Sequence, residues 1–145
     1  MTATRKIAVL TGSRAEYGLL TPIIAAIHED TTVELQLIVT GTHLSTEFGS
    51  TVKDIEFPIV ERVEILLSGD SPLAISKSMG LALIGIAEAL DRLKPDILVL
   101  LGDRFEILPA AAAAAPRRAP LRQRRGRAHC NRRQRRSPAA PAAAS

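Results

Sequence analysis

Short runs of apolar residues alternate along this chain with longer segments in which apolar residues recur every three or four positions. The short runs predict β-strands at residues 7–10, 33–40, 59–67 and 97–101. The last of these runs is wholly apolar, as expected for a strand that is covered on both faces. The longer segments predict helices at residues 17–29, 45–55 and 73–93, and an alanine-rich helix from residue 105 onward. Strands that alternate with helices predict an α/β fold, with a Rossmann-like parallel sheet and helices on both of its faces.

Three of the predicted strands lead into loops that begin with glycine and carry a charged or titratable side chain two positions later. These loops are Gly12-Ser13-Arg14, Gly41-Thr42-His43 and Gly102-Asp103-Arg104. In open parallel sheets, ligands bind just outside the carboxyl ends of the strands. The recurrence of this pattern therefore predicts a binding site at that edge of the sheet.

The first of these loops has the features of an anion-binding turn. Gly12 permits a sharp turn, Ser13 can cap the following helix, and Glu16 lies at the capping-box spacing from Ser13. A helix N-terminus attracts anions, and the forked guanidinium of Arg14 suits phosphate. The spacing alone is equally compatible with an ordinary strand-to-helix connection that carries a solvated arginine.

The other candidate residues also have simpler interpretations. Asp103 could cap the helix that follows its strand, although this role does not exclude catalysis. His43 could be an ordinary loop histidine, and Arg104 could pair with Glu106 or Asp103 at the surface. The sequence indicates neither a metal-binding cluster nor a covalent cofactor.

The charge of the chain divides sharply at about residue 115. Residues 1–115 hold nine Lys and Arg residues and all 15 acidic residues, a net charge of −6. Residues 116–145 hold ten Arg residues and no acidic residue, a net charge of +10. The basic isoelectric point is therefore a property of the last 30 residues, and we predict two segments, an α/β domain at 1–115 and a tail at 116–145.

The predicted tail is rich in Arg, Ala and Pro and poor in large apolar residues, so we expect it to be disordered. It has two competing interpretations. It could be a basic arm that binds nucleic acid through phosphates, although it lacks the lysine and aromatic residues usual in such arms. Its composition also matches a GC-rich reading frame translated out of phase, and we favour this second interpretation.

The chain has features typical of a cytoplasmic protein. Cys130 is its only cysteine, so an intrachain disulfide is impossible. The N-terminal residues do not fit a signal peptide, and no run of 18 apolar residues occurs, so we expect no membrane span.

Four motifs in this chain resemble those of a known enzyme family. They are GSRAEYG at residues 12–18, TGTHL at 40–44, KSMGLA at 77–82, and LKPD at 93–96 followed by LGDRFE at 101–106. In these motifs the chain is similar to the N-terminal half of the UDP-N-acetylglucosamine 2-epimerases, most of all to the hydrolysing branch that feeds sialic-acid-type sugar synthesis. The resemblance covers residues 6 to about 115 and stops there.

The resemblance implies a GT-B fold, in which two Rossmann-like domains hold a nucleotide sugar between them. It implies conversion of UDP-N-acetylglucosamine, or of a related UDP-diacetamido sugar, to UDP and the free manno-configured sugar. The implied steps are removal of the proton on carbon 2, expulsion of UDP to give a glycal, and addition of water with inversion at carbon 2. No cofactor is implied.

The resemblance also assigns roles to residues of the glycine loops. The implied catalytic residues are Asp103, an acidic group, and His43, on the cleft side of the sheet. The implied UDP-binding residues are Arg14, Arg104, Ser13 and Glu16, of which Glu16 orients the first loop.

Several family motifs are not found after residue 115, among them a Gly-Gly-Glu loop and a helix with a UDP-binding histidine. We therefore expect a truncated epimerase that is inactive by itself and exposes apolar surface. Full-length relatives are expected to be homodimers. Two alternatives remain open, a small α/β protein with a nucleic-acid-binding arm and a non-catalytic nucleotide-binding half-domain.

Overall fold

The computed structural model describes residues 4–47, 49–67, 69–102, 104–117 and 121–124. Its elements, in chain order, are β1 (Arg5–Thr11), α1 (Arg14–Glu29), β2 (Val33–Thr40), the 3₁₀ helices η1 (Gly41–Leu44) and η2 (Thr51–Asp54), β3 (Ile59–Val63), α2 (Pro72–Leu93), β4 (Ile97–Leu101), α3 (Ile107–Ala114) and β5 (Leu121–Arg124).

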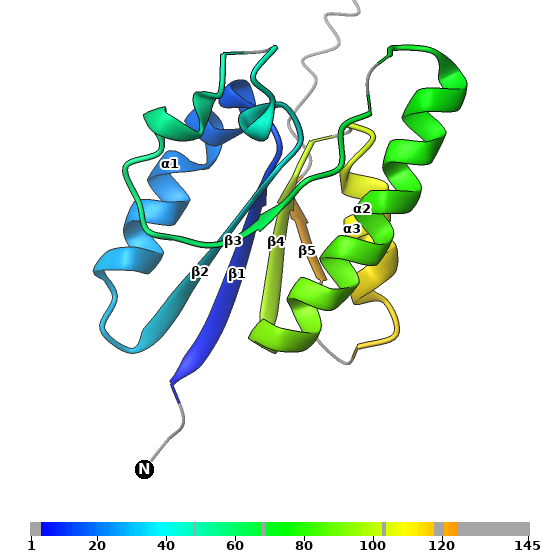
Figure 1. Cartoon of the computed structure of the whole chain (residues 1–145). Coiled ribbons are helices and arrows are strands. Elements are labelled where there is room, and N and C mark those ends of the chain that lie inside the picture. The colour runs from blue at the N-terminus through cyan, green and yellow to red at the C-terminus, as the bar shows by residue number, and fades with distance from the viewer. Residues whose placement is uncertain (1–3, 48, 68, 103, 118–120, 125–145) are drawn as a thin grey trace, which may run out of the picture.

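The strands form one parallel sheet in the order β3-β2-β1-β4-β5 (Figure 1). In its middle, Ile7 of β1 lies beside Leu35 of β2 on one side and Ile97 of β4 on the other. The chain moves outward from β1 to β3 and then returns to place β4 on the other side of β1. The order of the strands therefore reverses between β1 and β4, and such a switch point is where parallel sheets bind ligands.

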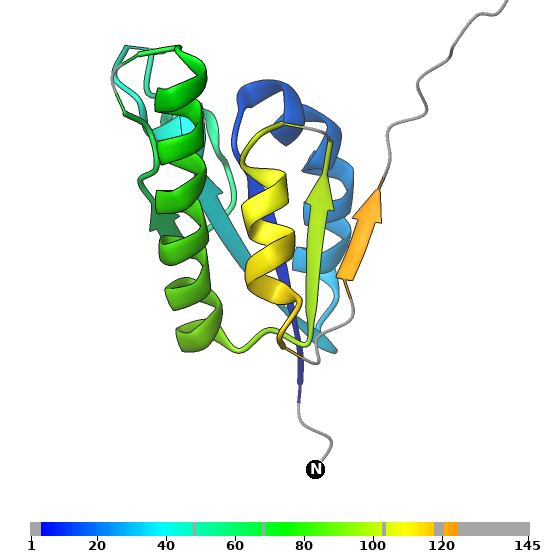
Figure 2. The same ribbon diagram turned by 90° about the vertical axis from the view of Figure 1, so that its right-hand side faces the viewer.

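Helices cover both faces of the sheet and create two separate cores. On one face, Val9, Leu37 and Val39 pack against Leu20 and Ile24 of α1. The core on the other face lies under α2 and α3, which run side by side (Figure 2). Its residues include Ala8, Leu10, Ile38, Leu98, Leu100, Ala82, Ile86, Leu90, Ile107 and Ala110. The alternation of Ala8, Val9 and Leu10 between the two cores follows from the two-residue period of a strand.

The helix ends follow the chemistry of their flanking residues. Ser71 caps α2 by accepting a hydrogen bond from the backbone N–H of Ala74 at 3.2 Å, and Pro72 occupies the first helical position. At the other end, Lys94 adopts the left-handed conformation, with φ of 47°. Pro95 then prevents the helix from continuing.

The largest departure from the predicted elements lies between β2 and β3. We predicted one short helix at residues 45–55, but the structure has two separate 3₁₀ helices, at Gly41–Leu44 and Thr51–Asp54. The positive φ of Gly49 (84°) and of Ser50 (46°) interrupts any continuous helix here. The helix predicted at residues 17–29 begins at Arg14 instead, which places Pro22 in its interior, and β3 ends at Val63 although we predicted it to residue 67.

The structure also corrects one part of the predicted disordered tail. Residues Leu121–Arg124 form β5, which pairs in parallel with β4 from Leu98 to Leu101. The outer edge of β4 offers unpaired backbone groups to any segment that can lie beside it, so this pairing does not need apolar side chains. Residues 118–120 and 125–145, including Cys130, lie outside the described residues.

Among the described residues, α2 alone is long and apolar enough, by length and composition, to cross a membrane. We expected no membrane span. In this structure one side of α2 is buried, at Ala82, Ile86, Ala89 and Leu90, and packs against the sheet. Helices in the core of a domain meet the same criteria of length and composition.

Candidate functional site

The three glycine loops meet at one edge of the sheet, as predicted, because β2, β1 and β4 are neighbours and run in the same direction. We call this edge the rim. The Thr42 hydroxyl donates a hydrogen bond to the carbonyl of Gly12 at 2.9 Å, which joins the loops after β1 and β2. The loop after β4 approaches the first helix closely, because a Cβ at Gly102 would lie 3.3 Å from Oε1 of Glu16.

The first loop forms the predicted helix cap. Ser13 is the N-cap of α1, and its hydroxyl accepts from the backbone N–H of Glu16 at 3.4 Å. The carboxylate of Glu16 turns back and accepts from the backbone N–H of Gly12 at 2.9 Å. In an ordinary capping box it would accept from the cap residue itself, here Ser13, so the contact lies one residue earlier. This hydrogen bond ties Glu16 to the first loop, and the role of Glu16 in UDP binding stays a prediction.

The structure adds a second reason for glycine at position 12. The chain turns here from β1, which ends at Thr11, into α1, which begins at Arg14. A Cβ at Gly12 would also collide with the carboxyl group of Glu106. Gly41 is constrained both by its backbone and by space, since its φ is 61° and a Cβ there would lie 2.9 Å from Oε1 of Glu106.

Arg14 lies at the N-terminus of α1, with 77% of its side chain exposed. Its nearest ionic partner is Asp54, at 3.8 Å between Nε and Oδ2, and such an exposed and loose pair contributes little. The guanidinium is therefore available to a ligand at the rim. The helix N-terminus beneath it adds unpaired N–H groups and a partial positive charge.

His43 is almost completely buried, at 1% exposure. Its Nε2 lies 3.1 Å from the Thr11 hydroxyl, and its Nδ1 lies 2.8 Å from the Thr51 hydroxyl. Burial lowers the pKa of His43, only partly opposed by a backbone hydrogen bond to Ser13 and by Asp54, so the imidazole is held neutral. The catalytic role of His43 stays a prediction, and its burial favours a role in positioning the loops.

Arg104 extends from the end of β4 and is partly exposed. Its Nε donates to Oε1 of Glu106 at 3.0 Å, so the pairing considered from the sequence is present. The pair is not at the surface, however, because the side chain of Glu106 is 0% exposed. Asp103, the predicted catalytic acid, lies outside the described residues.

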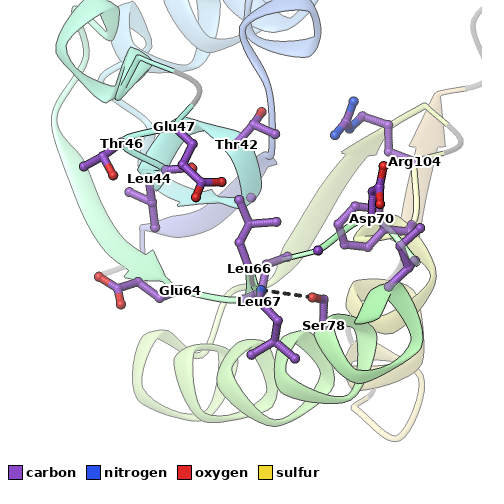
Figure 3. Close-up of a pocket in the computed structure, with 16 residues that line it drawn as sticks. Thr42, Leu44, Thr46, Glu47, Glu64, Leu66, Leu67, Asp70, Ser78 and Arg104 are labelled. Carbon is purple, nitrogen blue, oxygen red and sulfur yellow. Dashed lines mark hydrogen bonds between the residues drawn. The ribbon is translucent and has the colours of Figure 1, made fainter. Parts of the chain in front are cut away.

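A cavity of about 640 Å³ opens beside the rim, between the loops that follow β2, β3 and β4 (Figure 3). Its walls combine apolar side chains, such as Leu44, Leu66 and Phe105, with polar ones. The polar side chains that line it include Thr42, Ser45, Thr46, Glu47, Glu64, Asp70, Ser78 and Arg104. A mixed lining of this kind suits a ligand with both apolar and hydrogen-bonding groups, such as a sugar.

Some residues of this region were missed by the sequence analysis. Glu106 was considered only as a surface partner of Arg104, although it contacts two of the three glycine loops. Thr11 and Thr51 were not singled out, because a hydroxyl next to a strand or turn has no distinctive pattern. The described residues contain no group of three or more His, Cys, Asp or Glu side chains that could hold a metal ion.

This chain is similar in sequence to known proteins. The chain is 43% identical over 119 residues to a GDP/UDP-N,N'-diacetylbacillosamine 2-epimerase (hydrolyzing) from Campylobacter jejuni, a match that covers 81% of this chain and 31% of that protein. It is 37% identical over 113 residues to a UDP-N,N'-diacetylbacillosamine 2-epimerase (hydrolyzing) from Legionella pneumophila, covering 76% of this chain and 30% of that protein. The chain thus spans less than a third of the length of these curated relatives.

A solved structure gives the same result at the level of the fold. The UDP-GlcNAc 2-epimerase of Methanocaldococcus jannaschii, in complex with UDP-GlcNAc and UDP, matches with a TM-score of 0.65 and 26% identity. The match covers 81% of this chain and 32% of that one. The family model described as UDP-N-acetylglucosamine 2-epimerase matches residues 25–122, which extends past residue 115, where we expected the resemblance to stop. These 98 residues are most of the chain, which therefore belongs to the UDP-N-acetylglucosamine 2-epimerase family.

Proposed function

We propose that this chain supplies the N-terminal half of the active site of a hydrolysing 2-epimerase. Its substrate would be UDP-N-acetylglucosamine or a related UDP-diacetamido sugar, and its products UDP and the free manno-configured sugar. The reaction would proceed by removal of the proton on carbon 2, elimination of UDP to give a glycal, and addition of water. In a GT-B arrangement, a second domain would close over the rim and hold the rest of the nucleotide.

One observation carries this proposal, namely that the two loops at the switch point, which follow the neighbouring strands β1 and β4, each carry an arginine, and that the first of them opens a helix N-terminus. Arg14 stands at the start of α1, and Arg104 leaves the end of β4, the next strand. Elimination of UDP builds negative charge on the departing diphosphate, and cationic and N–H groups stabilise such charge. The names of the two curated relatives, both hydrolysing 2-epimerases, support the same reaction.

The remaining candidate residues take roles that fit their positions. We propose Asp103 as the catalytic acid or base near carbon 2, since in the sequence it comes directly after Gly102 in the loop that follows the strand at 97–101. Ser13 and Glu16 would keep the first loop in the shape that exposes backbone N–H groups to phosphate. His43 would hold the second loop in place from below.

Binding of UDP and of uridine by the purified chain, measured by calorimetry, tests the half-site directly. We expect weak, salt-sensitive binding of UDP and no measurable binding of uridine, because the proposed contacts are to phosphate. Arg14→Ala should weaken UDP binding about tenfold or more, the size expected for losing a charge-assisted contact. Equal binding of UDP and uridine, or an unchanged affinity of the variant, would contradict the proposal.

Arg92 provides a matched control for Arg14. It is an exposed arginine near the C-terminal end of α2, where its Nη2 pairs with Glu61 at 2.9 Å. That end of α2 leads into the start of β4, whereas the rim lies at the carboxyl ends of the strands. Arg92→Ala removes the same charge and should leave UDP affinity unchanged. If both variants weaken binding equally, UDP is attracted by overall charge and not by the rim.

Turnover is the second test of this proposal. We expect no release of UDP from UDP-N-acetylglucosamine by the chain alone, because it spans about 30% of its curated relatives. A chimera that carries residues 6–115 in place of the matching segment of the Campylobacter jejuni relative should release UDP. A folded but inactive chimera would show that this segment does not form a working half-site.

The composition of the last residues leads to a separate proposal. We propose that the Arg-rich segment is translated out of phase from about residue 122 onward, because the family match covers residues 25–122 and ends there. An intact neighbouring reading frame in the gene, continuing the α/β pattern, is the expected result. If no such frame exists and the chain binds RNA with a steep dependence on salt, a genuine basic arm is the better interpretation.

We also propose that the protein is cytoplasmic and that its full-length relatives form homodimers. The location is supported by the absence of cysteine from residues 1–115, so the described fold holds without a disulfide.

A further inference from the structure

Two buried carboxyl groups lie directly beneath the rim. The side chain of Glu106 is fully buried, and Glu16 is 6% exposed. Glu16 belongs to the first turn of α1, and Glu106 immediately precedes α3. These helices follow β1 and β4, the strands on either side of the switch point.

Each carboxyl group has only half of its hydrogen-bonding capacity satisfied. Oε2 of Glu16 accepts from the N–H of Gly12 at 2.9 Å, and Oε1 of Glu106 accepts from Nε of Arg104 at 3.0 Å. The other two oxygens, Oε1 of Glu16 and Oε2 of Glu106, are buried without a hydrogen-bond partner among the described residues. Buried polar atoms are normally paired, so an orphaned oxygen on each of two carboxyl groups that both approach Gly12 calls for an explanation.

The glycines of the rim show that these carboxyl groups are built into the loops. A Cβ at Gly12 or at Gly41 would run into Glu106, and one at Gly102 would lie 3.3 Å from Glu16. The three loops therefore close around the two carboxyl groups, and both groups contact Gly12. The pair joins the loop that carries Arg14 to the loop that carries Arg104.

The charges around the pair do not balance two ionised carboxylates. Arg104 is the one cation that contacts either group among the described residues. Arg14 is exposed and nearest to Asp54, while His43 is held neutral by burial. The acidic groups Glu64 and Asp70, which line the cavity together with Arg104, add further negative charge on that side.

A buried charge without compensation is strongly unfavourable. Two carboxylates and one guanidinium would leave one such charge, whereas the uptake of one proton would leave the three groups neutral. Burial raises the pKa of Glu16, and the nearby Glu106 raises it further, against the opposing effects of the Gly12 N–H and Arg104. A carboxylic acid is also a hydrogen-bond donor, which would give one orphaned oxygen a function.

We propose that Glu16 and Glu106 hold one proton between them near neutral pH, and that this pair positions Arg104 and links anion binding at the rim to protonation. The proton belongs to the pair and not to either residue. Only the identity of the anion, a UDP-sugar, rests on the proposed function.

The direction of the linkage follows from the charges. With one shared proton, the pair and Arg104 are neutral together, and with none they carry a charge of −1 beneath the rim. An anionic ligand therefore binds more weakly as the pH rises and the pair loses its proton. By the reciprocity of linked equilibria, anion binding favours protonation, so the protein takes up as much as one proton when the ligand binds.

Carbon NMR of the glutamate carboxyl groups tests the pair without any ligand. With ¹³C-labelled glutamate, we expect one extra proton to remain on the Glu16 and Glu106 signals at pH values where the other carboxyl groups are ionised. Glu16→Gln should abolish this high-pH titration, because Gln keeps an acceptor for Gly12 and needs no proton. Glu29→Gln, an exposed change at the end of α1, should leave the titration unchanged. If Glu16 and Glu106 both lose their protons over the same pH range as the other carboxyl groups, the proposal is overturned.

Calorimetry with UDP-N-acetylglucosamine tests the linkage, because its diphosphate has no titrating group near neutral pH. Repeated in buffers of different ionisation enthalpy, binding to the unmodified chain should take up a fraction of a proton. Binding to Glu16→Gln should take up none and should lose its dependence on pH. Binding with no proton uptake while the NMR shows a shared proton would overturn the linkage to Arg104.

The two experiments separate failure of this proposal from failure of the proposed function. If the NMR finds the shared proton but no UDP-sugar binds, the proposal of a shared proton is supported and the proposal of an epimerase half-site is contradicted. If a UDP-sugar binds but both carboxyl groups are ionised, the proposal of a half-site is supported and the proposal of a shared proton is contradicted. Glu106→Gln gives an independent check, since it keeps an acceptor for Arg104 and should also remove the high-pH titration.

Discussion

Burial beneath the rim changes the ionisation of single residues, and His43 is the simplest case. Its two ring nitrogens face the hydroxyls of Thr11 and Thr51. A neutral ring can form both hydrogen bonds, by donating from one nitrogen and accepting at the other. A charged imidazolium would have to donate from both nitrogens in a buried place. The loops after β1 and β2 are therefore joined by a group whose uncharged form is favoured by burial.

This predicts a loss of stability in mild acid. The pKa of His43 in the folded protein lies below its ordinary value of 6.5, so the unfolded chain binds the proton more readily. The stabilisation is complete above about pH 6.5 and is lost as the pH falls below it, with a slope of at most about 1.4 kcal/mol per pH unit. The proposed shared proton of Glu16 and Glu106 gives a slope of the opposite sign over the same range, because there the folded protein binds the extra proton. Chemical denaturation between pH 5 and 7 should therefore show the His43 slope as the difference between the unmodified chain and His43→Gln.

His43→Gln should remove that slope, whereas His28→Gln should keep it. His28 is an exposed histidine in the last turn of α1 and is the matched control. If both variants retain the slope, another group is responsible for it.

Single residues also set the limit of what could be read from the sequence at the rim. The three glycine loops could be found, because strand ends followed by glycine form a visible pattern. The buried state of Glu106 could not, because it depends on Gly12 and Gly41, which are distant in the chain and leave room for its carboxyl group. Whether a charged residue is buried is decided by tertiary packing, and local pattern carries little information about it.

At the level of elements, prediction succeeded where a pattern was long and regular. The strands at Val33–Thr40 and Ile97–Leu101 have the predicted limits, because their apolar runs are bounded by turn residues. Between Gly41 and Asp54 the prediction was wrong, since the left-handed conformations of Gly49 and Ser50 divide the segment. The strand at Leu121–Arg124 could not be predicted either, because backbone pairing with the edge of β4 created it.

Two glycines in α2 give a prediction at this scale. Gly80 faces open space, and a Cβ there would meet no atom within 4 Å. A Cβ at Gly85 would lie only 2.6 Å from Cγ1 of Val63 in β3, so Gly85 sets how closely α2 packs on the sheet. Gly80→Ala should stabilise the protein by about 1 kcal/mol through helix propensity. Gly85→Ala should destabilise it by about 1–3 kcal/mol through overpacking.

Urea denaturation of both single variants measures these effects. A double-mutant cycle of Gly85→Ala with Val63→Ala adds the decisive comparison, because removing Cγ1 makes room for the new methyl group. The double variant should be more stable than the sum of the two single effects. Additive effects would mean that α2 does not pack on Val63 in this way.

For the molecule as a whole, the two faces of the sheet differ in how much apolar surface their helices leave exposed. On the outer side of α2, Leu73, Leu81 and Ile84 are 66%, 42% and 61% exposed and are spaced by three to eight residues, so they share one side of the helix. On α1, the large exposed apolar residue is Leu19, at 69%. Several exposed apolar side chains on one side of a helix favour association more than a single exposed leucine does.

The chain should therefore self-associate through α2 at moderate concentration. Ile84→Lys places a charge in the middle of this surface and should shift the sedimentation profile towards monomer, with little change in stability because the site is exposed. Leu19→Lys introduces the same charge at a similarly exposed position on the opposite face and should leave the profile unchanged. Equal effects of both variants would show that added charge alone prevents association, and no effect of Ile84→Lys would exclude the outer side of α2 as the contact.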